Sequence, residues 1–311
     1  MPDKVYKYRP FSVNTLRALT EAEVFYAKPS TFNDPLDCDP TIDVDIDRRH
    51  LERLLYRMIV RRKNEEEGRN EIGRLRYNSS EYGDYRTNAE VESYLMRTLA
   101  STIKHELDLE LGDEGVLSLS ATWKSGLMWS HYADEHRGIC IEYDTRDQGH
   151  PRLKAVDYKG PRAIKTSDLY RWKVRDDLVA QERVFQTYFY TKSNEWKYEK
   201  EWRDVRDRNG VTDAPFRITA ILFGLRCNGS VIKSIVKLLN DHPQIKIWQV
   251  LPKDDGFGLR RYLVNRDEID AMAVREPSFL MFKDIVWDDL DDLEDLGTVA
   301  ELAGPEEDPG A

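Results

Sequence analysis

The chain has 311 residues, of which 40% are hydrophobic and 33% are charged, and it carries a net charge of −10. This composition excludes a disordered chain and describes a globular protein with a heavily solvated surface. Its longest apolar runs, such as residues 218–223, are far shorter than the roughly 20 residues that span a membrane, and residues 1–4 do not resemble a signal peptide. We therefore expect a cytoplasmic protein with no membrane contact.

The first 40 residues predict two strands and an acidic loop. Strands are expected at residues 5–8 and 23–27, on either side of a helical turn that begins at Asn14, a residue type that caps helices. Residues 32–37 read Phe-Asn-Asp-Pro-Leu-Asp, which is turn chemistry with two carboxylates. We expect this loop to be unusually acidic.

A helical insert is expected over about residues 45–112. The pattern predicts an amphipathic helix over residues 47–63, with arginines and lysines on its outer side. Residues 64–86 are polar and aperiodic, so we expect a loop there, and residues 87–90 form a capping box in front of another helix. The apolar stripe of the first helix consists of Leu51, Leu54, Leu55, Met58 and Ile59.

The remaining pattern predicts a single α+β domain over residues 1–283, without an internal repeat. Apolar and β-branched runs predict strands, and residues with helical periodicity predict helices. The expected strands are at residues 116–120, 138–143, 218–223, 245–248 and 261–264, and the expected helices at residues 125–133, 176–192 and 230–240.

The C-terminal residues form an acidic tail. Residues 284–311 contain eleven Asp and Glu and no Lys or Arg, which leaves a net charge of about +1 for residues 1–283 (−10 minus −11). Apolar residues recur among the acids at helical spacing. The tail is either a solvated terminus folded onto its own domain, for which the basic helix at residues 57–62 is suited, or a segment that docks on a basic partner.

Charged and aromatic residues crowd into residues 195–203. If this segment is extended, Glu199, Glu201 and Arg203 lie on one face, with the two carboxylates about 7 Å apart. Two such acids cannot both be buried and ionised without a cation, which Arg203 or Arg9 would supply. The alternative is an exposed, charged strand edge.

A second concentration of polar and aromatic residues follows in residues 118–132. Ser118 and Ser120 present two hydroxyl groups on one strand face. Trp129, His131 and Tyr132 come soon after, and such side chains suit the wall of a small-molecule pocket, where flat faces hold a ring and polar tips orient it. The alternative is a buried aromatic cluster.

Cysteine and histidine spacing indicates neither a disulfide framework nor a metal site. Cys38, Cys140 and Cys227 are far apart, so we interpret them as reduced thiols. His131 and His136 are five residues apart, a spacing that splays two side chains on a helix, and no third ligand is evident. We therefore expect no metal-binding residues.

Several short motifs together resemble a bacterial family of unknown function, over roughly residues 4–265. The same layout is a remote resemblance to the ADP-ribosyltransferase fold, which implies a split, mostly antiparallel central β-sheet with flanking helices. The motifs are YKYRPF at residues 6–11, FNDPLD at 32–37, SLS at 118–120, MWSHYA at 128–133, GICIEYD at 138–144 and WKYEKEWR at 196–203.

This resemblance implies an enzyme that cleaves NAD and transfers ADP-ribose to an unknown macromolecular acceptor, in the manner of a toxin or phage-defence effector. Glu201 would be the catalytic acid that stabilises the oxocarbenium-like charge, and Glu199 would orient the acceptor or accept its proton. The residues that would bind the nucleotide are Lys7, Tyr8, Arg9, Asn33, Asp34, Ser118, Ser120, Trp129, His131, Tyr132 and Arg203.

Three alternatives remain open at this point. One is a divalent-metal nuclease that uses Asp34, Asp37, Glu199 and Glu201. Another is a module that binds a nucleotide or a protein without catalysis. Nucleic-acid binding is the third, because a basic helix neutralises phosphates. The cations of that helix are Arg48, Arg49, Arg53, Arg57, Arg61 and Arg62.

Overall fold

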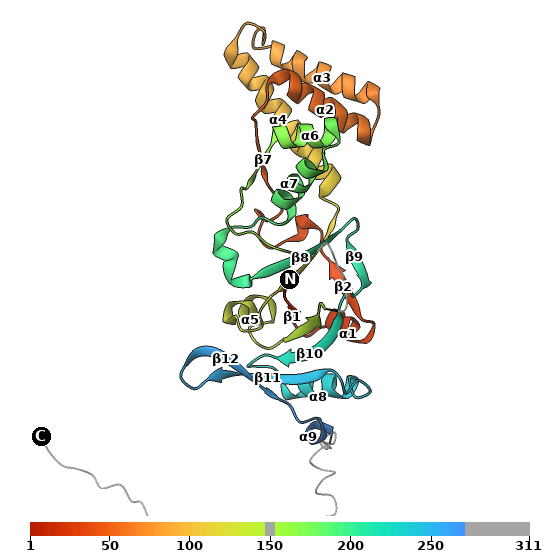
Figure 1. Ribbon diagram of the computed structural model, residues 1–311, viewed down its shortest axis with the longest axis vertical. Coiled ribbons are helices and arrows are strands. Elements are labelled where there is room, and N and C mark those ends of the chain that lie inside the picture. The colour runs from red at the N-terminus through yellow and green to blue at the C-terminus, as the bar shows by residue number, and fades with distance from the viewer. Residues whose placement is uncertain (147–152, 271–311) are drawn as a thin grey trace, which may run out of the picture. The chain divides into compact units, whose positions relative to one another are not determined.

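The computed structural model describes residues 1–146 and 153–270, and residues 1–266 form one compact unit (Figure 1). The acidic tail at residues 284–311, with its expected docking, lies outside the described residues. In the ranges that the structure describes, no helix combines the length and the apolar character that crossing a membrane requires.

An eight-stranded sheet forms the centre of the unit. Its strands pair antiparallel, except that β10 and β11 run parallel to each other. A large, mostly antiparallel sheet with several helices is the coarse form of the predicted α+β class, which is confirmed. In spatial order the strands are β12 (Gly256–Leu263), β11 (Lys246–Lys253), β10 (Arg217–Phe223), β5 (Ile139–Asp144), β1 (Lys4–Arg9), β4 (Gly115–Ser120), β8 (Glu201–Arg206) and β6 (Lys154–Ala155).

The strands β1 and β4 separate near the middle of this sheet. Tyr6 and Ser120 form the one register pair described between them, whereas β1 pairs with β5 along its whole length. Beyond that pair, the ammonium group of Lys7 donates a hydrogen bond of 2.7 Å to the carbonyl oxygen of Ser118. A side-chain hydrogen bond thus takes the place of backbone hydrogen bonds between β1 and β4 where the two strands diverge.

Two further sheets, each of two short strands, are separate from the central sheet. In one, β2 (Glu23–Tyr26) pairs with β9 (Gly210–Asp213), and in the other, β3 (Thr41–Asp43) pairs with β7 (Ala163–Lys165). The helix α1 (Val13–Thr20) begins one residue before the predicted cap Asn14. The cap is Ser12, because its hydroxyl group accepts the Thr15 N–H.

The helical insert contains three helices rather than two, so the loop predicted at residues 64–86 is wrong. Its helices are α2 (Arg48–Arg62), α3 (Glu65–Ser80) and α4 (Ala89–Leu111). Asn64 caps α3 by accepting the Glu67 N–H, and three glutamates occupy its first turn, where they complement the helix dipole. Its apolar side is narrow, and it packs Ile72 and Leu75 into the insert.

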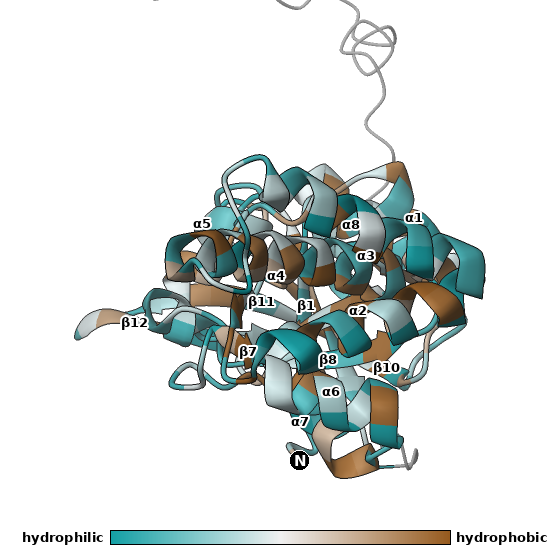
Figure 2. Cartoon of the chain, turned by 90° about the horizontal axis from the view of Figure 1, so that it is seen from above, coloured by the Kyte–Doolittle hydropathy of each residue, from teal (hydrophilic) through white to brown (hydrophobic). Residues whose placement is uncertain are grey.

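The insert and the following helices share one apolar core. The stripe predicted for α2 is confirmed, since all five of its apolar residues are buried. The helices α6 (Thr166–Arg175) and α7 (Leu178–Phe189) complete this core, and α6, which packs against α2, was not predicted (Figure 1). Figure 2 shows hydrophobic and hydrophilic residues alternating along the helices, as expected for helices with one buried side.

The segment that leads into β8 is only partly extended. Residues Asn194–Glu199 form a 3₁₀ helix, η2, and β8 begins at Glu201. The extended conformation predicted for Glu199 is therefore wrong. The other elements are η1 (Pro29–Thr31), α5 (Gly126–Tyr132), α8 (Gly229–Leu238) and α9 (Arg266–Asp270).

Candidate functional site

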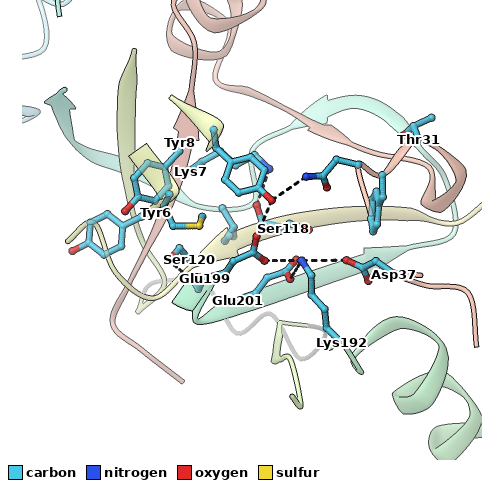
Figure 3. Close-up of a pocket in the computed structure, with 15 residues that line it drawn as sticks. Tyr6, Lys7, Tyr8, Thr31, Asp37, Ser118, Ser120, Lys192, Glu199 and Glu201 are labelled. Carbon is cyan, nitrogen blue, oxygen red and sulfur yellow. Dashed lines mark hydrogen bonds and ion pairs between the residues drawn. The ribbon is translucent and has the colours of Figure 1, made fainter. Parts of the chain in front are cut away.

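A cavity of about 290 Å³ opens where β1 and β4 diverge. Its wall comes from β1, β4, the loop after η1, the end of α5 and the segment from η2 into β8 (Figure 3). This size is at the lower end of ligand pockets, which range over roughly 300–1,000 Å³. The lining residues are Tyr6, Lys7, Tyr8, Thr31, Phe32, Asn33, Asp37, Ser118, Leu119, Ser120, Met128, Tyr132, Lys192, Glu199 and Glu201.

Lys192 joins three carboxylates on this wall (Figure 3). Its ammonium nitrogen lies 2.6 Å from Glu199 Oε2, 3.1 Å from Glu201 Oε2 and 3.2 Å from Asp37 Oδ2. All four side chains are only 4–5% exposed. Neither the buried lysine nor its role was predicted from the sequence.

Arg203 holds two of these carboxylates, Glu201 and Asp37, from behind the wall. Its guanidinium group donates to Glu201 Oε1 at 2.8 Å and to Asp37 Oδ2 at 2.6 Å, and it also donates to the Phe189 carbonyl at 2.8 Å. The Arg203 side chain is fully buried. Arg203 is thus a cation for Glu201, as predicted, although it does not itself line the cavity.

The two glutamates have pKa values displaced in opposite directions. Burial raises the pKa of Glu199, and the nearby charge of Glu201 adds to this, although Lys192 opposes it. Burial would also raise the pKa of Glu201, but Arg203 and Lys192 outweigh it and hold that pKa well below its usual range. One wall therefore carries a carboxylate whose pKa is lowered beside one whose pKa is raised, so Glu199 takes up a proton more readily than Glu201.

A left-handed residue brings both glutamates to the same cavity. Lys200 has φ of 47° and ends η2, so a left-handed backbone conformation separates the 3₁₀ helix that holds Glu199 from the strand that begins at Glu201. Two hydrogen bonds fix this turn: the Ser120 hydroxyl donates to the Glu199 carbonyl at 2.6 Å, and the Glu201 N–H donates to the Tyr158 hydroxyl at 2.8 Å. The shared orientation therefore comes from a turn and not from strand alternation.

A second lysine faces the cavity with different surroundings. The Lys7 ammonium group has no carboxylate partner among the described residues, and its hydrogen bond goes to the neutral Ser118 carbonyl. Burial, together with the nearby charge of Arg9, lowers the pKa of Lys7 to about 8. By contrast, its carboxylate neighbours raise the pKa of Lys192 despite burial.

Tyr132 and Asn33 connect the cavity wall to its rim. The Tyr132 hydroxyl donates to Glu199 Oε1 at 2.7 Å and accepts from the Asn33 amide at 3.3 Å. Asp34 lies outside the main cavity, where its Oδ2 accepts the Trp196 indole N–H at 2.8 Å. The acidic loop at residues 32–37 thus contacts the segment at residues 195–203.

Besides Asp34 and Arg203, three more of the residues predicted to bind the nucleotide do not line this cavity. Trp129 is fully buried in the core, where its indole N–H donates to the Trp123 carbonyl. His131 is exposed and stands 6.4 Å from the Tyr198 ring. Arg9 lines a second cavity of about 290 Å³ with residues of α1, β2 and β9.

The carboxylates assigned to a metal in the nuclease alternative do not form a metal site. Among residues 1–146 and 153–270, no group of three or more His, Cys, Asp or Glu side chains is arranged to hold a metal ion. The Lys192 ammonium group lies between Asp37, Glu199 and Glu201, in the position that a cation would need. No feature of the wall favours the nuclease alternative.

Residues 128–203 match the model of a family described as a protein of unknown function (DUF2971). This confirms the resemblance to a family of unknown function over that segment. The matched segment contains five residues that line the cavity: Met128, Tyr132, Lys192, Glu199 and Glu201. Neither the curated proteins nor the solved structures include a match to the chain.

Proposed function

We propose that the chain is an ADP-ribosyltransferase-like enzyme that cleaves NAD and transfers ADP-ribose to an acceptor. The observation that carries this proposal is the pair Glu199 and Glu201, which share Lys192 on a cavity wall and have pKa values displaced in opposite directions. The divergence of β1 from β4 supports the split sheet that such a fold requires.

The two glutamates suit the two charge movements of the reaction. When the bond between nicotinamide and ribose breaks, its electron pair leaves with nicotinamide and positive charge develops on the ribose ring. The ionised Glu201 carboxylate stabilises that charge and binds the ribose 2′-hydroxyl. Glu199 accepts the proton that the acceptor loses as it forms the new bond to ribose.

The charges around the cavity are balanced. Asp37, Glu199 and Glu201 provide three carboxylates, and Lys192, Arg203 and Lys7 provide three cations. Lys192 and Arg203 are paired with the carboxylates, whereas the Lys7 ammonium group donates to a neutral carbonyl oxygen. Lys7 is therefore the cation of the cavity that is suited to a phosphate group of NAD.

Lys7 is suited to the diphosphate of NAD. It lies on β1 and lines the cavity without an ion-pair partner among the described residues, whereas Arg9, two residues further along, lines the second cavity. We place the reaction in the cytoplasm, where NAD is available. The unpaired, buried thiols of Cys38 and Cys140 fit that reducing compartment.

Transfer of label from NAD tests this proposal. The protein is incubated with NAD labelled in its ADP-ribose part and with a cell lysate, and Glu201→Gln is compared with Glu195→Gln, an exposed carboxylate on η2. We expect Glu201→Gln to lose label transfer by about 100-fold or more, since a preorganised charge is removed, and Glu195→Gln to retain it. Absence of label transfer and of nicotinamide release in the wild type would refute the proposal, and NAD binding without turnover would favour the non-catalytic module.

A further inference from the structure

The helix α2 carries a row of arginines that the cavity does not use. Arg49, Arg53 and Arg57 are spaced four residues apart, and all three are exposed. At 1.5 Å per residue they extend over about 12 Å along one side of the helix. None of them forms an ion pair with an acidic side chain of the described residues. We call these three residues the arginine row.

The other arginines of α2 are engaged within the fold. Arg48 pairs with Glu52 at 3.0 Å, Arg62 pairs with Glu106 at 2.6 Å, and Arg61 pairs with an aspartate at the end of α6. The sequence offered all six arginines as one basic helix. The structure divides them into three that are neutralised by neighbouring acids and three that are available to a partner.

The helix α2 presents charge without apolar anchors. The apolar side chains of α2 are directed into the core of the insert, where they are buried. Interfaces between proteins depend on a few buried aromatic or aliphatic anchors, whereas binding to a nucleic-acid backbone depends mainly on Arg and Lys contacts to phosphates. The row therefore resembles the second kind of surface.

Local charge decides whether a polyanion binds here, because residues 1–283 carry a net charge of only about +1 (−10 minus −11). Three guanidinium groups about 6 Å apart face a regular series of negative charges in a phosphate backbone. Each guanidinium group also donates two parallel hydrogen bonds to the oxygens of one phosphate group.

We propose that the arginine row of α2 is a binding surface for the phosphate backbone of a DNA duplex, independent of base sequence. This inference does not rest on the proposed function of the cavity, because it uses none of the residues of the cavity wall. If both hold, the surface concentrates the protein on nucleic acid while the cavity carries out its chemistry.

Binding of a short, fluorescently labelled, mixed-sequence DNA duplex to the full chain, measured by anisotropy at increasing salt, tests this proposal. Three phosphate contacts predict a slope of about −2.7 in log K against log salt, which is a loss of about 40-fold in affinity between 50 and 200 mM. In the triple variant Arg49→Gln, Arg53→Gln, Arg57→Gln, we expect the slope to approach zero. The single variant Arg53→Gln should reduce it by about one, and it guards against misfolding of the triple variant.

The matched control is Arg69→Gln with Arg74→Gln. Both residues lie on the neighbouring helix α3 and are as exposed as the row, but they pair with Glu65 and Glu71. Wild-type slope and affinity in this control support the proposal. An unchanged salt slope in the triple variant, or a loss of DNA affinity in the control equal to that in the triple variant, would overturn the proposal. It would also be overturned if polyglutamate displaced the labelled duplex as effectively as unlabelled DNA does, and that result would assign the row to an acidic protein.

Discussion

The cavity wall and the arginine row both concentrate charge, but they treat it in opposite ways. On the wall, Lys192 and Arg203 are buried among carboxylates that come from distant parts of the chain. In the arginine row of α2, the three side chains are exposed to solvent and form no ion pair with an acidic side chain of the described residues. Burial fixes the first group and displaces its pKa values, which suits chemistry. Solvation leaves the second group free to bind and sensitive to salt.

The largest difference between the two regions should appear in stability. Arg203→Met removes a buried cation and leaves Asp37 and Glu201 short of a partner, so we expect a loss of about 3–5 kcal/mol in the free energy of unfolding. The control Arg74→Met breaks the exposed pair with Glu71 and should cost at most about 1 kcal/mol. Urea unfolding measures both, and equal losses would show that burial of the network contributes nothing.

The next prediction concerns how activity depends on pH. We expect activity to rise with the ionisation of Glu199 and to fall with the deprotonation of Lys7, which gives the pH profile a rising and a falling limb. Glu199 accepts a proton only when it is ionised, so nicotinamide release should rise with pH through a value above the ordinary glutamate pKa. Lys7 binds phosphate only when it is charged, so activity at low NAD should fall as pH rises through about 8. Lys7→Arg keeps the charge and should remove the falling limb.

Lys200→Arg is the matched control for this profile, since Lys200 is exposed beside the wall but does not line the cavity. It should keep both limbs. A falling limb that persists in Lys7→Arg would show that another group titrates there and that Lys7 does not bind the phosphates.

A smaller shift is expected from Tyr132→Phe. The Tyr132 hydroxyl donates to Glu199 at 2.7 Å and favours its ionised form, so its removal raises the Glu199 pKa further. Because a hydrogen bond to a charged group contributes about 1.5–3 kcal/mol, the rising limb should move to higher pH by about one to two units. At a pH above that limb, the rate should recover. A loss that is independent of pH would instead indicate a role in binding.

The smallest effect belongs to the arginine row. Replacing Arg49, Arg53 and Arg57 with Gln removes no ion pair described in the structure, so the free energy of unfolding should change by less than about 0.5 kcal/mol. The same urea experiment measures this. A loss of several kcal/mol would mean that the row stabilises the fold, which would remove the contrast with the cavity wall.

Much of the fold could be predicted from the sequence because its strands are continuous apolar or alternating runs, as in β4, β5 and β10. The helix α3 escaped prediction because its apolar side is narrow, with Ile72 and Leu75 among charged residues. Its stability depends on packing against α2 and on its cap at Asn64, and neither appears as helical periodicity.

The site could be predicted less completely. The high density of charged residues around Glu199 and Glu201 led to the prediction that both belong to the site, and the structure brings both to one cavity. The turn at Lys200 that orients them could not be predicted from the residue pattern. Lys192 was missed because a lysine after a helix is ordinarily exposed, and its burial depends on Asp37 from far along the chain. Trp129 was expected on the cavity wall, but its side chain is buried in the core. A large aromatic ring contributes more to the stability of the fold when it is buried than when it is exposed.

Release of nicotinamide from NAD is the measurement that tests the central claim most directly. The wild type, Glu201→Gln and Glu195→Gln are compared at neutral pH, after urea unfolding has verified that each variant is folded. We predict release by the wild type and by Glu195→Gln, and a loss of about 100-fold or more in Glu201→Gln. Equal release by all three proteins, or no release by the folded wild type, would contradict a role of this wall in cleaving NAD.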